Sequence, residues 1–168
     1  KSDGKTWTPK NYSGRGHGMV PMIQALSQSY NLSTVRLGQE FGLSTFINHL
    51  KQFGVTSNIP SYPSIYLGAV DMSPMEVMNI YGNFATGGFR YPVKAIRSVV
   101  DANGRSLDRY SLSVQPTIDP AAAYALNYGL QQVMASGTGR AAYNSLPRTL
   151  NLAGKSGTTN DSRDSWFA

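Results

Sequence analysis

Apolar residues recur at the spacing of an α-helix over three short segments in the first part of the chain. Pro21 suits the first turn of the first helix, Asn31 would cap the second, and Ser44 would cap the third. Gly42 and Gly54 are expected to end the second and third helices in a left-handed conformation. The apolar faces, which we expect to be core, are Met22, Ile23, Leu26 and Tyr30; Val35, Leu37 and Phe41; and Phe46, Ile47, Leu50 and Phe53.

Two further helices are predicted from their starting residues. Ser73-Pro74-Met75-Glu76 has the pattern of a capping box, and the helix it begins should end at Gly87-Gly88. The methionines at positions 72, 75 and 78 are expected to fill the core. Asp119-Pro120 should begin the longest helix, which ends at 136–139. Its buried side is predicted to hold Ala122, Leu126, Leu130, Val133 and Met134.

Loops and strands account for the rest. Residues 1–18 and 55–70, which are rich in glycine or proline, predict loops. Residues 91–100 and 105–110, joined by a turn with Asn103-Gly104, predict a peripheral β-hairpin over 91–110. A strand that holds Lys155 should pair, across a turn at 160–164, with a strand that begins at Ser165.

Composition excludes several classes of protein. The 168 residues suit one domain or a large piece of one. The net charge is +6, but the lysines and arginines are scattered, so no nucleic-acid partner is predicted. The chain has no cysteine, and its two histidines, His17 and His49, lie far apart, so neither a metal nor another cofactor is expected. No apolar run approaches the length of a membrane span.

Candidate chemistry gathers in Gly154-Lys155-Ser156-Gly157-Thr158. Small residues let a ligand approach the backbone, while the lysine and the hydroxyls suit an anionic or carbonyl-bearing substrate. A phosphate loop would need a glycine where Thr149 stands, and a helix where turn residues follow. The alternative is the Lys-Ser/Thr-Gly motif of penicillin-interacting serine enzymes, whose Ser-x-Asn partner motif is present upstream as Ser29-Tyr30-Asn31.

Much of the chain around these motifs also resembles the transpeptidase domain of class A penicillin-binding proteins, which are bifunctional cell-wall synthases. The similar segments are 7–12, 25–31, 85–88, 137–140 and 164–168. The resemblance implies the α+β fold of penicillin-binding transpeptidases and β-lactamases, an antiparallel sheet flanked by helices. Residues 1–168 would form a partial domain that holds the helical subdomain and the first strands of the sheet.

In that family a serine attacks a peptide carbonyl, and an amine later takes the acyl group. The resemblance implies that Ser29 relays a proton, that Asn31 holds the family's lysine and a substrate amide, and that Lys155 orients Ser29. Ser156, Gly157 and Thr158 would bind substrate, and the Thr158 N–H would also serve the oxyanion. The plain alternatives are helix caps for Ser29 and Asn31 and a solvated strand lysine for Lys155. Thr159 and Asn160 suit a turn, and Arg140 stays undecided.

No convincing nucleophile motif precedes Ser29. Ser2-Asp3-Gly4-Lys5 has the Ser-x-x-Lys spacing but no apolar run to form a helix. We therefore expect residues 1–168 to be an inactive fragment. The resemblance implies a periplasmic parent protein, anchored in the membrane through its N-terminal part. Its expected partners are stem peptides ending in D-Ala-D-Ala and β-lactam antibiotics.

Two other functions of this fold are alternatives to a transpeptidase. A class A β-lactamase needs a glutamate that activates water. Neither Asp71 nor Glu76 is followed by that enzyme's Leu-Asn pattern, and a capping role explains Glu76. A non-catalytic β-lactam sensor or peptidoglycan-binding module of the same fold is the second alternative.

Overall fold

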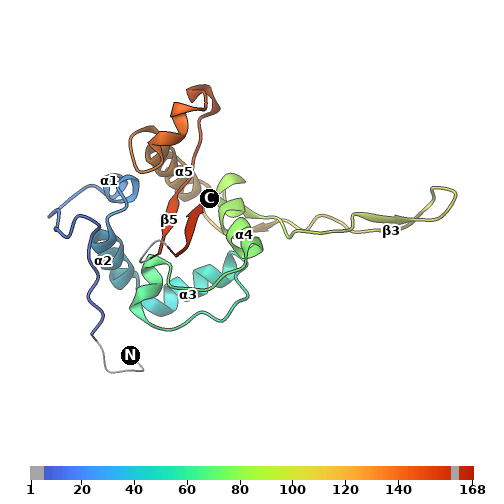
Figure 1. The fold of residues 1–168 in the computed structure, drawn as a ribbon. Coiled ribbons are helices and arrows are strands. Elements are labelled where there is room, and N and C mark those ends of the chain that lie inside the picture. Colours follow the sequence, from blue (N-terminus) through green and yellow to red (C-terminus); the bar gives the residue numbers. More distant parts are fainter. Residues whose placement is uncertain (1–5, 160–162) are drawn as a thin grey trace.

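The computed structural model describes residues 6–159 and 163–168 (Figure 1). Within these residues the helices, with short 3₁₀ helices labelled η, are α1 (Met22–Ser27), α2 (Asn31–Phe41), α3 (Leu43–Gln52), η1 (Pro63–Leu67), α4 (Pro74–Ala85), α5 (Pro120–Ala135), η2 (Arg140–Asn144) and η3 (Arg148–Leu150). Short strands form antiparallel pairs: β1 (Phe89–Arg90) with β4 (Gln115–Pro116), β2 (Ser98–Val100) with β3 (Ser106–Arg109), and β5 (Ser156–Thr158) with β6 (Ser165–Phe167).

Local side-chain chemistry begins two of the helices as predicted. At α4, the Ser73 hydroxyl accepts from the Glu76 N–H at 3.3 Å, and the Glu76 carboxylate accepts from the Ser73 N–H at 2.8 Å. At α5, the Asp119 carboxylate accepts from the N–H groups of Ala121 and Ala122. The capping box and the Asp119 cap are therefore confirmed, because both depend on residues close together in sequence.

At three other helices the start lies close to the predicted position, but the role predicted for the starting residue is wrong. Pro21 is the cap residue of α1 and lies before its first turn, and Gly42, not Ser44, is the cap residue of α3. Asn31 is the first residue of α2, and its side chain caps nothing there. Instead, the buried Asn11 accepts a hydrogen bond at 3.0 Å from the N–H of Leu32. A cap supplied by a distant loop leaves no local sequence signal.

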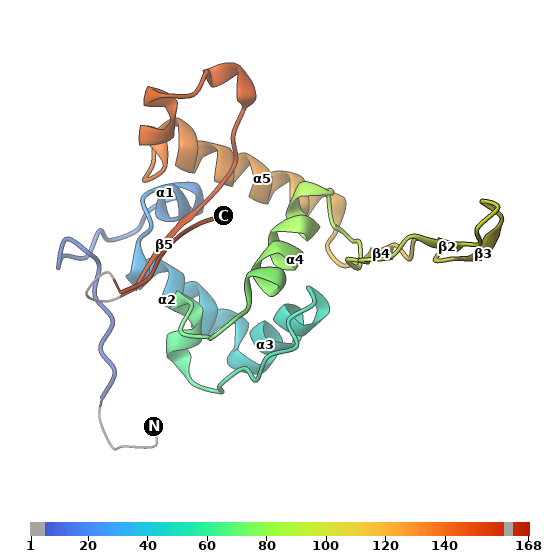
Figure 2. The ribbon, with the colours of Figure 1, turned by 45° about the vertical axis from the view of Figure 1, so that its right-hand side comes forward.

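Helix α5 organises the body of the protein. It packs against α1 on one side and α4 on another, while α2 packs against η1 and α3 (Figures 1 and 2). The largest fully buried apolar side chains are Ile65, Val133 and Met134. Ala123 is buried and Ala122 is exposed, so the predicted inner face of α5 was wrong at that position.

Several apolar side chains predicted as core are exposed. Phe41 is 60% exposed, and both Met75 and Met78 are 50% exposed. The apolar stripes of α2 and α3 line an open cavity of about 540 Å³ together with residues 117–119. Apolar spacing identifies the face of a helix that avoids water, but it does not identify what covers that face.

The buried Glu76 carboxylate joins α4 to the preceding loop. It accepts hydrogen bonds from the N–H and hydroxyl groups of Ser73, Ser57 and Thr56, at 2.7–3.1 Å. The backbone N–H groups, that of Ser73 foremost, hold the pKa of Glu76 well below its usual range. The same loop region contains η1, so the prediction of an irregular loop over 55–70 was incomplete.

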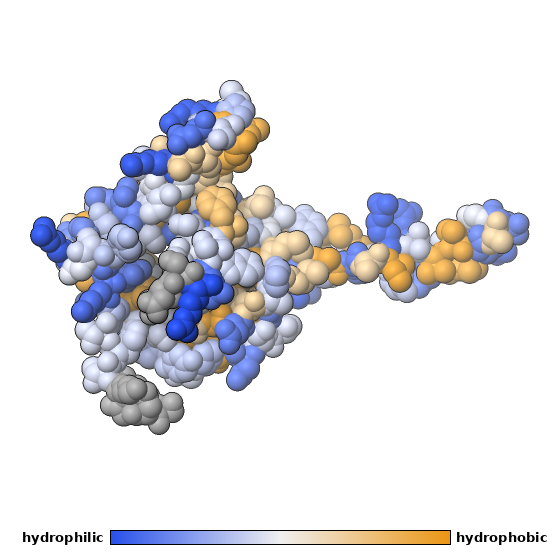
Figure 3. Space-filling view, viewed as in Figure 1, coloured by the Kyte–Doolittle hydropathy of each residue, from blue (hydrophilic) through white to orange (hydrophobic). Residues whose placement is uncertain are grey.

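A β-hairpin arm, formed by β2 and β3, extends from the body (Figure 2). The strand predicted over 91–100 is regular only at Ser98–Val100, and pairing between β1 and β4 joins the arm to the body. Exposed apolar side chains, including Val100, Leu107 and Leu112, follow the arm outward (Figure 3). Among residues 6–159 and 163–168, no helix has the length and apolar character needed to cross a membrane.

Candidate active site

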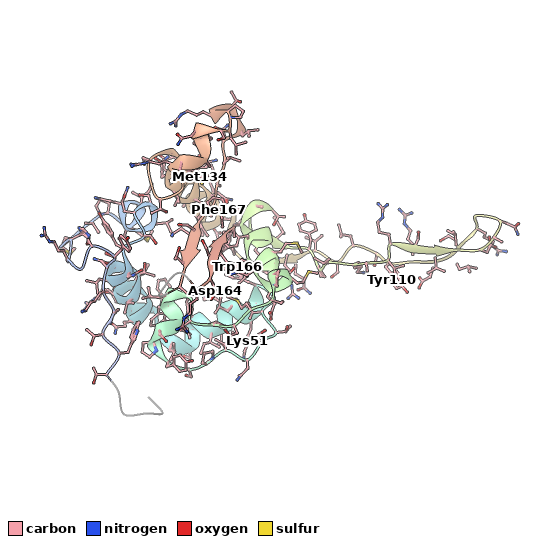
Figure 4. The ribbon with its side chains drawn as sticks, viewed as in Figure 1. Lys51, Tyr110, Met134, Asp164, Trp166 and Phe167 are labelled. Atoms are coloured by element: carbon pink, nitrogen blue, oxygen red, sulfur yellow. The ribbon has the colours of Figure 1, made fainter. Side chains whose placement is uncertain are left out.

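Strand pairing near the C-terminus sets the frame of the site. The backbone groups of Lys155 and Ala168 exchange hydrogen bonds of 2.8 and 3.2 Å, which extends the pairing of β5 and β6 by one residue. The N–H of Thr159 donates to Asp164 at the other end, 3.1 Å away. The side chains of Trp166 and Phe167 lie along β6 (Figure 4). The predicted partner strand from Ser165 is thus confirmed.

The two motifs meet through one hydrogen bond. Lys155 Nζ donates to Ser29 Oγ at 2.8 Å, although the residues are 126 positions apart, and it also donates to the Ser156 carbonyl at 3.0 Å. Partial burial lowers the pKa of Lys155, because desolvation disfavours its charged form. An ammonium that is partly withdrawn from water interacts more strongly with nearby negative charge than a surface lysine does.

Ser29 lies at the sharp junction between α1 and α2. Its backbone φ is +57°, in the left-handed region that residues other than glycine and asparagine rarely adopt. Such a conformation costs about 1–3 kcal/mol and persists where the surrounding structure imposes it. The junction directs the Ser29 hydroxyl toward Lys155, and no local sequence pattern predicts this backbone conformation.

A loop before α1 braces the Ser-x-Asn motif. Asn31 Nδ2 donates to the Lys10 carbonyl at 2.9 Å, and the His17 ring stacks on Tyr30 with ring centres 4.0 Å apart. The Asn31 amide has a second hydrogen and a carbonyl oxygen for other partners. Sequence reasoning missed Lys10, Asn11 and His17 as supports, because a backbone carbonyl, a distant cap and a stacked ring have no characteristic spacing.

The edge of β5 that faces away from β6 presents backbone groups that no other strand within residues 6–159 and 163–168 pairs with. In an antiparallel pair, successive residues direct their N–H and C=O groups to opposite edges. Because Lys155 bonds to β6, the N–H groups of Ser156 and Thr158 face the other edge, which is unpaired among the described residues. The Ser156 carbonyl, which accepts from Lys155 Nζ, lies on that same edge.

The two glycines that flank Lys155-Ser156 have different surroundings. A Cβ on Gly154 would lie 2.8 Å from the Phe167 ring and 2.9 Å from the Ala168 carbonyl, so packing requires glycine there. A Cβ on Gly157 would meet only Trp166 Cβ, at an ordinary contact distance of 3.7 Å. The protein itself therefore leaves room for a side chain at Gly157.

The other candidates have these positions. Thr159 Oγ1 accepts from the Asp164 N–H at 2.8 Å, as a turn residue does, and Arg140 is exposed at the start of η2. Ser2-Asp3-Gly4-Lys5 and Asn160 lie outside the described residues. Thr138, which sequence reasoning left out of the site, has its hydroxyl 3.1 Å from that of Ser156. No group of three His, Cys, Asp or Glu side chains in 6–159 and 163–168 could hold a metal ion.

The chain is similar to known proteins over nearly its whole length. Residues 1–165 match the family model of the penicillin-binding protein transpeptidase domain. The chain is 39% identical to penicillin-binding protein 1B of Vibrio cholerae over 99% of its own length and 21% of that protein's. It is 36% identical to penicillin-binding protein 1B of Escherichia coli, again over 99% of its length, which is 20% of that protein's. The chain thus spans only about a fifth of these relatives.

Solved structures show the same fold. Penicillin-binding protein 1A from Haemophilus influenzae superposes on the whole chain with a TM-score of 0.88 at 24% identity, and the match covers 31% of that structure. Penicillin-binding protein A from M. tuberculosis, solved as an imipenem acyl-enzyme complex, gives a TM-score of 0.80 at 19% identity over 98% of this chain and 42% of its own. The predicted fold class and the resemblance stated from the sequence are confirmed: this chain belongs to the penicillin-binding protein transpeptidase family and forms part of such a domain.

Proposed function

We propose that this chain is part of a peptidoglycan synthase that cross-links stem peptides ending in D-Ala-D-Ala by serine acyl transfer, and that β-lactams acylate the same serine. The observation that carries the proposal is the 2.8 Å hydrogen bond from Lys155 Nζ to Ser29 Oγ, which joins the two motifs. The family membership and the acyl-enzyme structure of a protein with this fold also support it.

In the proposed reaction, a serine in a Ser-x-x-Lys segment outside residues 1–168 attacks the carbonyl of the D-Ala-D-Ala bond. The C–N bond breaks, D-Ala leaves as an amine, and the acyl group remains as a serine ester. The amine of a second stem peptide then attacks the ester and releases the serine. The hydroxyl proton that the attacking serine loses passes through Ser29 to the leaving nitrogen. The Ser29 oxygen accepts from Lys155, so its own O–H can donate to that nitrogen.

The oxyanion and the carboxylate of the substrate need donors of their own. The Thr158 N–H, on the edge of β5 that faces away from β6, would donate to the oxyanion, and one such donor typically contributes about 10²–10³ in rate. The hydroxyls of Ser156 and Thr158 and the Lys155 ammonium would bind the carboxylate. The space beside Gly157 would accept the substrate backbone. Asn31 would hold a substrate amide and the lysine of the Ser-x-x-Lys segment.

The place of action forms part of the proposal. By analogy with the class A proteins, the parent would be anchored in the membrane through another segment and would work on the periplasmic side. The net charge of +6 suits an anionic cell wall.

Labelling with a fluorescent penicillin, followed by intact mass, tests the function. Residues 1–168 alone should give no adduct, and the longer protein with its Ser-x-x-Lys segment should give one adduct per chain. Ser29→Ala and Lys155→Ala in the longer protein should slow acylation strongly. An adduct on residues 1–168 would overturn the assigned roles. A longer protein that binds penicillin without forming an adduct would favour the non-catalytic sensor or wall-binding module.

A further inference from the structure

The turn that follows α5 is fastened to the last residue of α1. The Thr138 N–H donates to the Ser27 carbonyl at 3.1 Å, and Gly137 lies so close that a Cβ there would be 2.2 Å from the same oxygen. Gln28 Nε2 also donates to the Ser136 carbonyl, at 3.4 Å. The backbone at Thr138 is therefore held against Ser27, which is two residues before Ser29 in the sequence.

The side chain of Thr138 reaches the other half of the site. Its Oγ1 lies 3.1 Å from the Oγ of Ser156 on β5. Thr138 thus connects α1, which ends at Ser27, with β5, which follows Lys155, in parallel with the hydrogen bond between Lys155 and Ser29.

The protons in this hydroxyl pair can be counted. Each hydroxyl has one O–H donor and two acceptor lone pairs, and either oxygen can donate across the 3.1 Å contact. If Ser156 donates to Thr138, a lone pair of Ser156 faces the cleft and repels a carboxylate, which only accepts hydrogen bonds when ionised. If Thr138 donates to Ser156, the Ser156 proton is free to donate into the cleft.

We propose that Thr138 is a positioning residue that donates to Ser156 Oγ and so directs the Ser156 O–H toward the carboxylate of a stem peptide or β-lactam. The inference rests on the proposed function. The resulting chain runs from Thr138 to Ser156 to the carboxylate with every O–H pointing in one direction, an arrangement in which each bond polarises and strengthens the next.

The test uses the longer protein with its Ser-x-x-Lys segment and measures the second-order rate of acylation by benzylpenicillin and by its methyl ester. Thr138→Val removes the hydroxyl but keeps the N–H that bonds to Ser27. It should slow acylation by the free acid several-fold, because Ser156 loses the neutral hydrogen bond that orients and polarises its O–H. Acylation by the uncharged ester should change much less. Thr138→Ser should restore the rate. Thr45→Val, the same change at an exposed position on α3, is the matched control and should have no effect.

A double-mutant cycle shows whether Thr138 acts through Ser156. In a Ser156→Ala background, Thr138→Val should cause no further loss. A loss that persists in that background, or that is equal for acid and ester, would mean that Thr138 acts only on the fold, and it would overturn the inference.

The inference and the proposed function fail differently. If Ser29→Ala and Lys155→Ala slow acylation but Thr138→Val does not, only the role of Thr138 is refuted. If Ser29→Ala and Lys155→Ala leave acylation unchanged, the proposed function itself fails.

Discussion

Gly154 and Gly157 are three positions apart on the same segment, and alanine at each should have different consequences. At Gly154 the added Cβ would lie 2.8 Å from Phe167 Cζ and 2.9 Å from the Ala168 carbonyl oxygen. At Gly157 its nearest neighbour would be Trp166 Cβ at 3.7 Å. Gly154→Ala should therefore impair folding, and Gly157→Ala should impair only the reaction with substrate.

The backbone contact decides the size of the effect at Gly154. The Phe167 ring is 56% exposed, so it can rotate away at little cost. The Ala168 carbonyl cannot, because it accepts the 2.8 Å hydrogen bond from the Lys155 N–H that holds β5 to β6. Overpacking of this kind typically costs about 1–3 kcal/mol. In a domain of 150–250 residues, each kcal/mol lowers Tm by about 2–4 °C.

The assay compares the two variants in the longer protein with its Ser-x-x-Lys segment. Thermal and denaturant unfolding measure stability, and fluorescent-penicillin labelling at a temperature where both variants are folded measures acylation. Gly154→Ala should lower Tm, whereas Gly157→Ala should keep the wild-type Tm but react slowly. Equal loss of stability at both positions would refute the distinction. Wild-type acylation by Gly157→Ala would refute the placement of substrate beside that residue.

Three further predictions concern Ser29, Lys155 and Glu76. Ser29→Gly should be more stable than Ser29→Ala by about 1 kcal/mol, because glycine adopts a φ of +57° without strain; equal unfolding free energies would contradict this. Because burial lowers the pKa of Lys155, acylation should fall on the alkaline side at a pH below 10.5. The stability of the wild type relative to Lys155→Met should rise as the pH increases through the lowered pKa of folded Lys155, because the unfolded chain then binds more protons than the folded one. Denaturant midpoints of both proteins between pH 7 and 10 check this, and a fall in the difference would count against it. Glu76→Gln should lower Tm at pH 7. Because the pKa of Glu76 is depressed in the folded protein, the stability difference between the wild type and Glu76→Gln should shrink only below about pH 4.3, the pKa of a glutamate in the unfolded chain. An advantage already lost at pH 6, in a pH series of Tm, would show that the carboxylate does not hold its hydrogen bonds.

Sequence reasoning succeeded where the determinants are local. Ser73 and Glu76 lie three residues apart, and Asp119 caps the N–H groups that follow it, so their spacing alone identified the starts of α4 and α5. It failed where the partner is distant. Asn11 caps α2 in place of Asn31, and Phe41 lines an open cavity although its spacing is that of a core residue.

The sequence by itself determined the family and the two motifs, because Ser29-Tyr30-Asn31 and Lys155-Ser156-Gly157 are patterns of residue type at short range. The resemblance implied that Lys155 orients Ser29, but only the tertiary structure gave the hydrogen bond by which Lys155 reaches Ser29 across 126 positions. Only the structure showed that Ser29 adopts a left-handed conformation and that Thr138 joins the site. These features depend on how α5 and the β5–β6 pair pack against the junction of α1 and α2. Packing brings together residues whose separation in sequence carries no periodic signal, so no spacing rule could predict them.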